Sequence, residues 1–318
     1  MKKPLISIVF TSYNHKSYLE KSLLSVINQD YPNLEIFVID DNSNDGSQHI
    51  LKKIKSNYPQ INLILRSKNS GGYVNSLNRD LKYTNGEYLS FIQCDDYISS
   101  DYYSKMIHQI DNYENIGAIF CRSNIINSKG VKISDDFMVR EKSFRNLIKS
   151  YRNLIPGNQM TLFLNFSCVI PNLSGVLISK NAYLELRGLN NDYSVVSDWD
   201  FYIRMSSRFN FIYINEKLNN FRFHNKTIRS KTSSFKILSE IGKMFDRNSH
   251  LFNINSFFFK IRIGSIIFSY LKDEKLLSLS SIQKIRPIFN KFFICTELYI
   301  FFGFLKNLYE YLNKSKQK

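Results

Sequence analysis

The sequence predicts an α/β fold, in which a mostly parallel, Rossmann-like sheet is flanked by helices and followed by a helical C-terminal extension. Within the first hundred residues, short apolar runs alternate with segments of helical periodicity. This alternation is typical of strands buried between two layers of helices. From about residue 236 onward, apolar residues recur at helical spacing. We therefore expect an α/β domain over residues 1–235 and a basic, aromatic-rich helical region over residues 236–318.

The first strand is expected at 6–10, an apolar run rich in β-branched residues. A helix follows, because apolar side chains recur on one stripe up to Ile27. Ser17 and Glu20 have the spacing of a capping box, which predicts that this helix starts near Ser17. By the same criteria, the next strands are expected at 34–39, 61–65 and 88–93, and the next helices at 47–57 and 73–83.

The pattern is less regular in the middle of the chain. A helix is expected near 101–113 and a strand at 118–121, followed by an irregular stretch over 127–166. Further strands are expected at 175–178 and 211–214, a helix from about 197 to 207, and an extended element at 221–224.

The net charge of the 318-residue chain is +16, which suggests an anionic partner. Residues 236–318 contain 14 basic and 6 acidic side chains, so this quarter of the chain holds half of the excess. Two interpretations of this region stay open: it lies on an anionic membrane surface, or it packs on the catalytic domain or on another subunit in an oligomer. Nucleic-acid binding is disfavoured, because bulky aliphatic residues dilute the basic ones and no known module is present.

The four cysteines, at positions 94, 121, 168 and 295, form no C-x-x-C pair, which disfavours a zinc site and a disulfide framework. The start of the chain does not resemble a signal peptide. The most apolar stretch, 292–305, is too short to span a membrane and contains Glu297. We expect a cytoplasmic protein, either free or peripheral on the inner face of the cell membrane.

Polar side chains follow three of the predicted strands, at the point where each strand ends. They are the blocks Thr11-Ser12-Tyr13-Asn14, Asp40-Asp41-Asn42-Ser43 and Asp95-Asp96. Because the carboxyl ends of parallel strands meet at one edge, these blocks should converge there, where such folds bind ligands. An isolated acidic pair could simply cap a helix. Four carboxylates close together repel one another, and a divalent cation with a phosphate-bearing ligand would resolve that repulsion.

With their order and spacing, these blocks resemble glycosyltransferase family 2. The resemblance covers residues 4 to about 230 and rests on Val9-Phe10-Thr11-Ser12-Tyr13-Asn14, Val38-Ile39-Asp40-Asp41-Asn42-Ser43, Gly86-Glu87-Tyr88-Leu89-Ser90-Phe91-Ile92-Gln93-Cys94-Asp95-Asp96, Gly175-Val176-Leu177-Ile178 and Ser197-Asp198-Trp199-Asp200. It implies a GT-A fold and an inverting, metal-dependent transfer of a hexosyl-type sugar. The implied donor is a nucleotide-diphosphate sugar, preferably a UDP-sugar, and the implied acceptor is a glycan or lipid-linked glycan in surface polysaccharide or glycolipid synthesis.

The resemblance also implies roles for individual residues. The donor would be bound by Thr11, Tyr13, Asp41, Asn78, Asp95 and Arg222, and Mn²⁺ or Mg²⁺ by Asp95, Asp96 and His224. Asp198 would act as the catalytic base, with Asp200 as second choice. For Asn78 and His224, a purely structural role is the alternative, and for Asp198 the alternative is an ordinary acid at a helix start.

Two departures from the family pattern keep other functions open. Gln93 and Ser197 stand where the family usually has acidic residues. A catalytically inactive, membrane-associated scaffold is therefore one alternative, and a sugar nucleotidyltransferase is another. The latter would need a glycine-rich loop after the first strand, and none is present there. A dehydrogenase is disfavoured because no G-x-G-x-x-G occurs. Gln283-Lys284-Ile285-Arg286 lacks the Trp of the Q-x-x-R-W segment of processive enzymes, so we expect single-sugar transfer.

Overall fold

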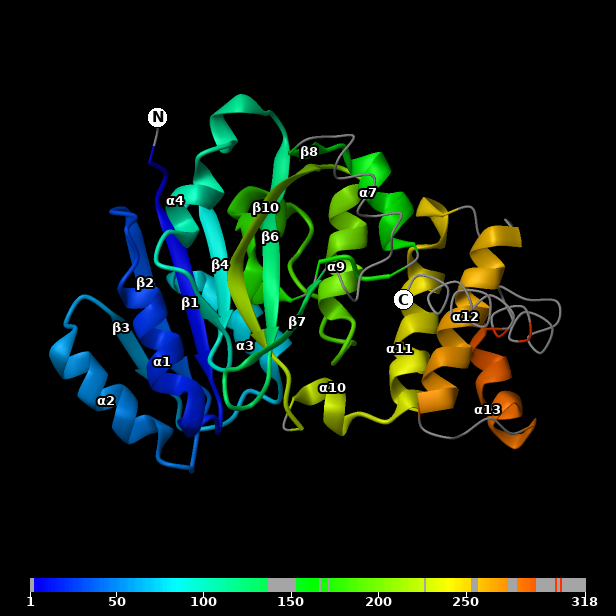
Figure 1. Cartoon of the computed structure of the whole chain (residues 1–318), viewed down its shortest axis with the longest axis horizontal. Coiled ribbons are helices and arrows are strands. Elements are labelled where there is room, and N and C mark those ends of the chain that lie inside the picture. The colour runs from blue at the N-terminus through cyan, green and yellow to red at the C-terminus, as the bar shows by residue number, and fades with distance from the viewer. Residues whose placement is uncertain are drawn as a thin grey trace. The chain divides into compact units, whose positions relative to one another are not determined.

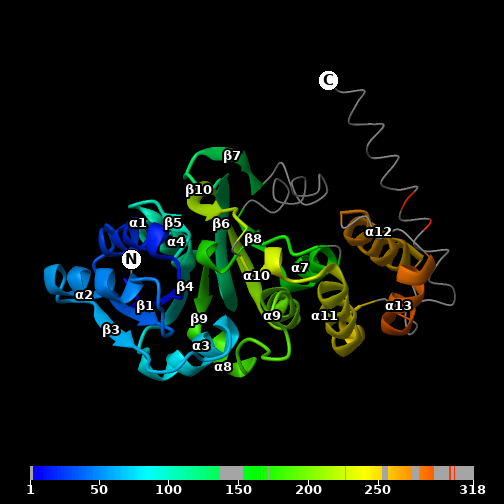
Figure 2. The same cartoon turned by 90° about the horizontal axis from the view of Figure 1, so that it is seen from below.

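The computed structural model describes most of the chain, namely residues 3–136, 153–165, 167–170, 172–225, 227–252, 257–273, 279–289, 301 and 304. The chain divides into two compact units (Figures 1 and 2). The first unit comprises Met1–Phe163 and Cys168–Asn225, and the second comprises Leu164–Ser167 and Lys226–Lys318.

The first unit is built on one mixed sheet. In spatial order, its main strands are β3 (Asn62–Leu65), β2 (Leu34–Asp40), β1 (Ile6–Ser12), β4 (Tyr88–Gln93), β9 (Val176–Ser179), β6 (Ile116–Ile126), β10 (Asn210–Arg222) and β5 (Tyr97–Ile98). Two further strands lie off this path: β7 (Lys132–Asp135) pairs with β6 and β8 (Leu154–Ile155) with β10. The strands from β3 to β4 are all parallel, whereas β9 is antiparallel to both of its neighbours.

Helices cover both faces of this sheet, and Figure 2 shows α1 and α4 on one side and α3 and α8 on the other. On the face that α1 and α4 cover, alternate residues of β1, such as Ile8 and Phe10, pack against buried side chains of α1, α2 and α4. The helices of the first unit are α1 (Lys16–Ile27), α2 (Ser47–Asn57), α3 (Tyr73–Asp80), α4 (Tyr102–Ile107), α7 (Gly157–Leu164), α8 (Lys180–Glu185) and α9 (Ser197–Ser206), α7 reaching one residue into the second unit. Short 3₁₀ turns lie at Leu81–Tyr83, Ile110–Asn112 and Leu173–Gly175.

The α/β class and the helical C-terminal part are therefore confirmed, but three local predictions are wrong. Helix α1 begins at Lys16, near the expected start, but the expected capping box of Ser17 and Glu20 is absent: the N-cap residue is His15, and Asp45 Oδ2 accepts from the Lys16 main-chain N–H at 2.9 Å. Helix α4 ends at Ile107, earlier than expected. The segment expected at 211–214 and the first two residues of that expected at 221–224 belong to the single strand β10, which ends at Arg222 and contains register irregularities.

The second unit consists of helices in its described part. They are α10 (Ile228–Lys231), α11 (Ser234–Arg247), α12 (Phe257–Asp273) and α13 (Leu279–Phe289), with a 3₁₀ turn at Ser249–Leu251. The ring of Phe245 on α11 contacts Phe252 and Phe259 at centroid distances of 5.6 and 5.5 Å. None of the helices in the described residues combines the length and apolarity needed to cross a bilayer. The apolar stretch 292–305 lies almost entirely outside the described residues.

Candidate active site

The carboxyl ends of β1, β2 and β4 lie side by side at one edge of the sheet. Ser12 at the end of β1 is in register with Asp40 at the end of β2, and Thr11 is in register with Gln93 at the end of β4. The polar blocks that follow these three strands therefore start from the same edge, as the sequence predicts.

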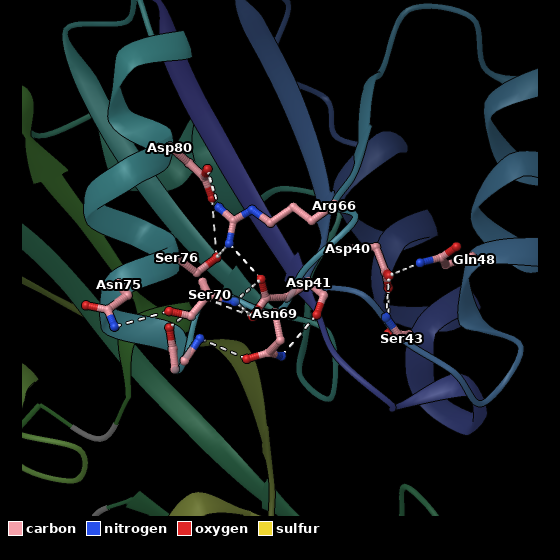
Figure 3. A network of polar contacts seen from close by, with 12 residues as sticks. Asp40, Asp41, Ser43, Gln48, Arg66, Asn69, Ser70, Asn75, Ser76 and Asp80 are labelled. Atoms are coloured by element: carbon pink, nitrogen blue, oxygen red, sulfur yellow. Dashed lines mark hydrogen bonds and ion pairs between the residues drawn. The ribbon is translucent and has the colours of Figure 1, made fainter.

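Asp41 is the centre of a buried polar network just after β2 (Figure 3). Its carboxylate accepts from Arg66 Nη1 at 2.7 Å and from both the main-chain N–H and the hydroxyl of Ser70. Arg66 follows β3 directly and forms a second ion pair with Asp80 at the end of α3. Burial raises the pKa of Asp80 in spite of this ion pair. Burial would also lower the pKa of Arg66, but its two carboxylate partners outweigh that effect and raise it.

Asp40 has a different task. Its oxygens accept from the main-chain N–H of Ser43 at 2.8 Å, from the Ser43 hydroxyl at 2.6 Å and from the Gln48 side chain at 3.0 Å. Asp40 is also fully buried. Its contacts are those of a residue that fixes the turn between β2 and α2.

Asp96 is buried and accepts hydrogen bonds from two other parts of the chain, the segment before β9 and the end of β10. Oδ2 accepts from the side chains of Asn172 and Ser174, and Oδ1 accepts from the main-chain N–H of Arg222 at 2.9 Å. Burial and then the charge of Asp95 raise its pKa well above the ordinary value, against the effect of these hydrogen bonds. Because both oxygens are already used, these contacts give no support to the expectation that Asp96 binds a metal directly.

Asp95 lies in a setting that suits a cation better. Its Oδ2 is 3.0 Å from Nε2 of the buried His224, which comes two residues after β10. His15, just after β1, is close to both: one ligand atom from each of these three side chains can be chosen so that all lie within 4.8 Å of one another. Imidazole nitrogen and carboxylate oxygen together suit Mn²⁺ and similar divalent ions.

Arg222 fixes the position of Asp95 through the main chain. Its Nε donates to the Asp95 carbonyl oxygen at 2.8 Å, and its Nη1 donates to the carbonyl of Asn127 at 3.0 Å. The guanidinium carbon lies 4.4 Å from the ring centroid of Tyr18. These contacts make Arg222 a positioning residue in this structure, and its expected contact with the donor stays a prediction.

Asp198 lies in the first turn of α9, where its Oδ1 accepts from the main-chain N–H of Trp199 at 2.8 Å. The preceding hydroxyl, Ser197 Oγ, is 2.6 Å from the hydroxyl of Tyr73. Tyr73 is the first residue of α3, three positions after the Ser70 that binds Asp41. The segment from Ser70 to Tyr73 therefore contacts the Asp41 network at one end and the start of α9 at the other.

Asp200, the second choice for the base, is used elsewhere. It is buried and forms an ion pair with Arg204 at 2.8 Å, and Arg204 also donates to the carbonyls of Leu186 and Gly188. This arrangement ties α9 to the loop after α8. It leaves Asp198 as the more accessible acid of the α9 first turn.

The remaining predicted donor residues differ in how they are placed. Asn78 donates to the carbonyl of Leu189 at 2.8 Å and accepts from the hydroxyl of Tyr183 at 2.7 Å. These contacts fit the purely structural role that is the alternative to donor binding at this position. Thr11 is buried and donates weakly to Gln93 at 3.4 Å. Tyr13 is 47% exposed at the edge.

Sequence reasoning missed His15, Arg66, Ser174 and Asn172. A signal existed for both His15 and Arg66, because His15 is the third residue after β1 and Arg66 is the first residue after β3, and both strands end at the acidic edge. Ser174 and Asn172 gave no such signal, because they reach Asp96 from the irregular segment before β9.

Comparison with known proteins identifies the family. The model of "Glycosyl transferase family 2" matches residues 7–173, more than half of the chain. A poly(ribitol-phosphate) beta-glucosyltransferase of Bacillus spizizenii is 30% identical over 212 residues, which cover 62% of this chain and 32% of that protein. An uncharacterized glycosyltransferase of Haemophilus influenzae is 28% identical over 206 residues, 64% of this chain and 60% of its own length. Across the first three curated relatives, the chain covers only 60%, 43% and 41% of their lengths.

Solved structures show the same fold at low sequence identity. TarS 1–349 of S. aureus in complex with UDP-GlcNAc matches with a TM-score of 0.62 and 17% identity, covering 91% of this chain and 80% of that one. The mannosyltransferase PcManGT of Pyrobaculum calidifontis, in complex with GDP-Man and Mn²⁺, matches with a TM-score of 0.57 and 14% identity, covering 97% and 88%. With the family match over more than half of its length, the chain belongs to glycosyltransferase family 2.

Proposed function

We propose that this protein transfers one sugar, with inversion, from a nucleotide-diphosphate sugar to an acceptor hydroxyl of a surface polysaccharide or glycolipid. The observation that carries the proposal is the placement of Asp95 beside His224, at the same sheet edge as the buried Asp41 network. The family membership supports glycosyl transfer. The relative that acts on poly(ribitol-phosphate) and the neighbours with bound nucleotide sugars support the classes of acceptor and donor.

In this proposal the donor base is recognised at Asp41. Arg66 and Ser70 hold its carboxylate in place, and a base N–H would share an oxygen that already accepts from them. Thr11 and Tyr13 would contact the rest of the nucleoside. A uridine donor is our first choice, because the solved complexes of TarS contain UDP and UDP-GlcNAc.

Asp95 and His224 would hold the divalent cation, and Arg222 keeps the Asp95 backbone in place. Bound there, the cation supplies charge neutralisation to the leaving diphosphate. Asp198 takes the proton of the acceptor hydroxyl, whose oxygen forms the new bond to the anomeric carbon as the bond to the diphosphate breaks. Attack from the side opposite the leaving group inverts that carbon.

We also propose that residues 1–235 perform catalysis, whereas residues 236–318 bring the enzyme to a lipid-linked acceptor at the inner face of the membrane. The net charge of +8 on the latter region, from 14 basic and 6 acidic residues, supports attraction to anionic headgroups.

The decisive experiment is donor turnover. Purified protein is incubated with a panel of nucleotide sugars, with and without Mn²⁺, and release of the nucleotide diphosphate is measured. We expect metal-dependent release from one donor and its loss in Asp95→Asn. The control is Asp30→Asn, which changes an exposed acid in the loop after α1 and should release the nucleotide diphosphate as the unchanged protein does.

Two results would contradict the proposal. A folded protein that binds no nucleotide would be a scaffold, and formation of a nucleotide sugar from a sugar phosphate and a nucleoside triphosphate would indicate a nucleotidyltransferase.

A further inference from the structure

We propose that His15 is a third protein ligand of the cation, which makes the site two imidazoles and one carboxylate and gives it a preference for Mn²⁺ over Mg²⁺. The role of the cation in turnover rests on the proposed function. The ligand set itself rests only on the arrangement of His15, Asp95 and His224.

The contacts of the His15 ring determine which nitrogen can bind a metal. Nδ1 lies 2.7 Å from the main-chain oxygen of Tyr13. A carbonyl oxygen only accepts, so Nδ1 must carry the hydrogen and Nε2 must carry the lone pair. Metal-binding histidines commonly have this arrangement, with the second ring nitrogen donating to a carbonyl that orients the ring.

The lone pair on Nε2 has no other use. Among the described residues, Nε2 of His15 is a buried atom without a hydrogen-bond partner. A buried acceptor that lacks a partner costs free energy, and such an atom calls for an explanation. The obvious structural one fails, because His15 precedes α1 as its N-cap residue but its side chain caps no main-chain N–H.

The three side chains are already close to the geometry of a bound ion. In an octahedral site with bonds of about 2.1 Å, neighbouring ligand atoms lie about 3.0 Å apart. Asp95 Oδ2 and His224 Nε2 have this spacing, at 3.0 Å, and the whole set fits within 4.8 Å. The two imidazoles lie 5.4 Å apart between centroids with planes at 70°, so their edges can converge on one point.

The surroundings hold this geometry in place. Tyr18 packs its ring 5.2 Å from that of His224 and 6.2 Å from that of His15, between centroids. Arg222 lies against the same tyrosine and holds the Asp95 main chain.

A second imidazole changes which metals the site accepts. Mg²⁺ strongly favours oxygen ligands and keeps its waters, whereas imidazole suits the transition metals. Replacing a water or oxygen ligand by His15 should therefore raise the affinity for Mn²⁺ and do little for Mg²⁺.

The test counts imidazoles on the bound ion. Full-length protein with ¹⁵N-labelled histidine is loaded with Mn²⁺ alone, and nitrogen couplings are measured by pulsed EPR. We expect two coupled histidine nitrogens in the unchanged protein and one in each of His15→Ala and His224→Ala. The exposed His49 on α2 provides the control, and His49→Ala should retain both couplings.

Calorimetric titration supplies the second readout. In His15→Ala we expect Mn²⁺ affinity to fall by about 10–100-fold, with Mg²⁺ affinity nearly unchanged and the thermal unfolding midpoint kept. Two couplings that persist in His15→Ala, or equal losses for both metals, would overturn the proposal. These readouts need no nucleotide sugar, so an enzyme without turnover would contradict the proposed function and leave the ligand assignment standing.

Discussion

At the scale of single residues, the four acids of the sheet edge differ in what compensates their charge. Asp40 accepts hydrogen bonds from the turn that follows β2, at Ser43. Asp41 contacts Arg66 and Ser70, and Asp96 accepts from three hydrogen-bond donors. Among the described side chains, the one that contacts the Asp95 carboxylate is His224. Most of the repulsion that the sequence suggests is therefore resolved by the protein itself, and the need for a cation narrows to Asp95.

Arg66 gives the sharpest prediction for stability at this scale. Arg66→Leu would leave Asp41 and Asp80 buried without their shared partner, so we expect the free energy of unfolding to fall by about 3–5 kcal/mol. Chemical denaturation measures this change. Arg79→Leu, at the exposed position directly before Asp80 on α3, should change stability by no more than about 0.5 kcal/mol. Similar values for the two variants would show that the network contributes little.

Asp198 gives the corresponding prediction for catalysis. Asp198→Asn removes the proton acceptor but keeps the shape, so turnover should fall by about 10²–10⁴-fold while donor affinity is retained. Steady-state kinetics together with nucleotide-sugar binding separates the two effects. Asp192→Asn, at an exposed acid before α9, serves as the control. Undiminished turnover in Asp198→Asn would assign the base to another residue.

At the scale of elements, the sequence predicted some segments to the residue and missed others for a physical reason. Helix α2 and strand β4 have the expected bounds, because local periodicity and flanking turn residues specify them. The start of α1 depends on Asp45, and the donors to Asp96 come from the segment before β9 and the end of β10. Such distant partners leave no local pattern. The acidic edge was predictable, whereas the groups that neutralise it were not.

The contacts of Glu35 on β2 predict how the stability of the fold depends on pH. Burial alone would raise its pKa, but hydrogen bonds from Ser7, Asn85 and Gly86 outweigh burial and lower it below the ordinary 4.5. A lowered pKa in the folded state means that the stabilisation is present above pH 4.5 and is lost as the pH falls through the folded value. These hydrogen bonds join β1, β2 and the turn before β4.

The variant Glu35→Gln should therefore melt at a lower temperature than the unchanged protein at pH 7, and this gap should close as the pH falls below 4.5. Thermal unfolding at a series of pH values measures it. The exposed Glu20 on α1 is the matched site, and Glu20→Gln should show no such convergence. A gap that is independent of pH would mean that the Glu35 charge is not responsible.

At the scale of the whole molecule, charge is divided unequally between the parts of the chain. Lys314, Lys316 and Lys318 add to the basic excess of residues 236–318. If this region meets an anionic membrane, replacing these three lysines by Gln should weaken binding to phosphatidylglycerol vesicles by about 100-fold, at roughly 1 kcal/mol per charge. Sedimentation with vesicles at low salt measures this loss.

In the control, three exposed lysines of the first unit are replaced by Gln, so both variants have the same total charge. These lysines are Lys52, Lys53 and Lys68. It should bind as the unchanged protein does. Equal binding to phosphatidylglycerol and phosphatidylcholine vesicles would instead favour packing of the basic region against protein.

The register of β10 sets which side chains reach the acidic edge. Arg222 and His224 are buried there, whereas Phe223 between them is 63% exposed. Upstream, Asn215 and Glu216 have no counterpart on β6, between the pairs Ile214–Cys121 and Lys217–Arg122. Strand β10 therefore contains unpaired residues between its paired parts. A change that shifted the pairing beyond these residues by one position would exchange the two faces of the strand, and the Phe223 ring would then stand where the His224 imidazole is needed.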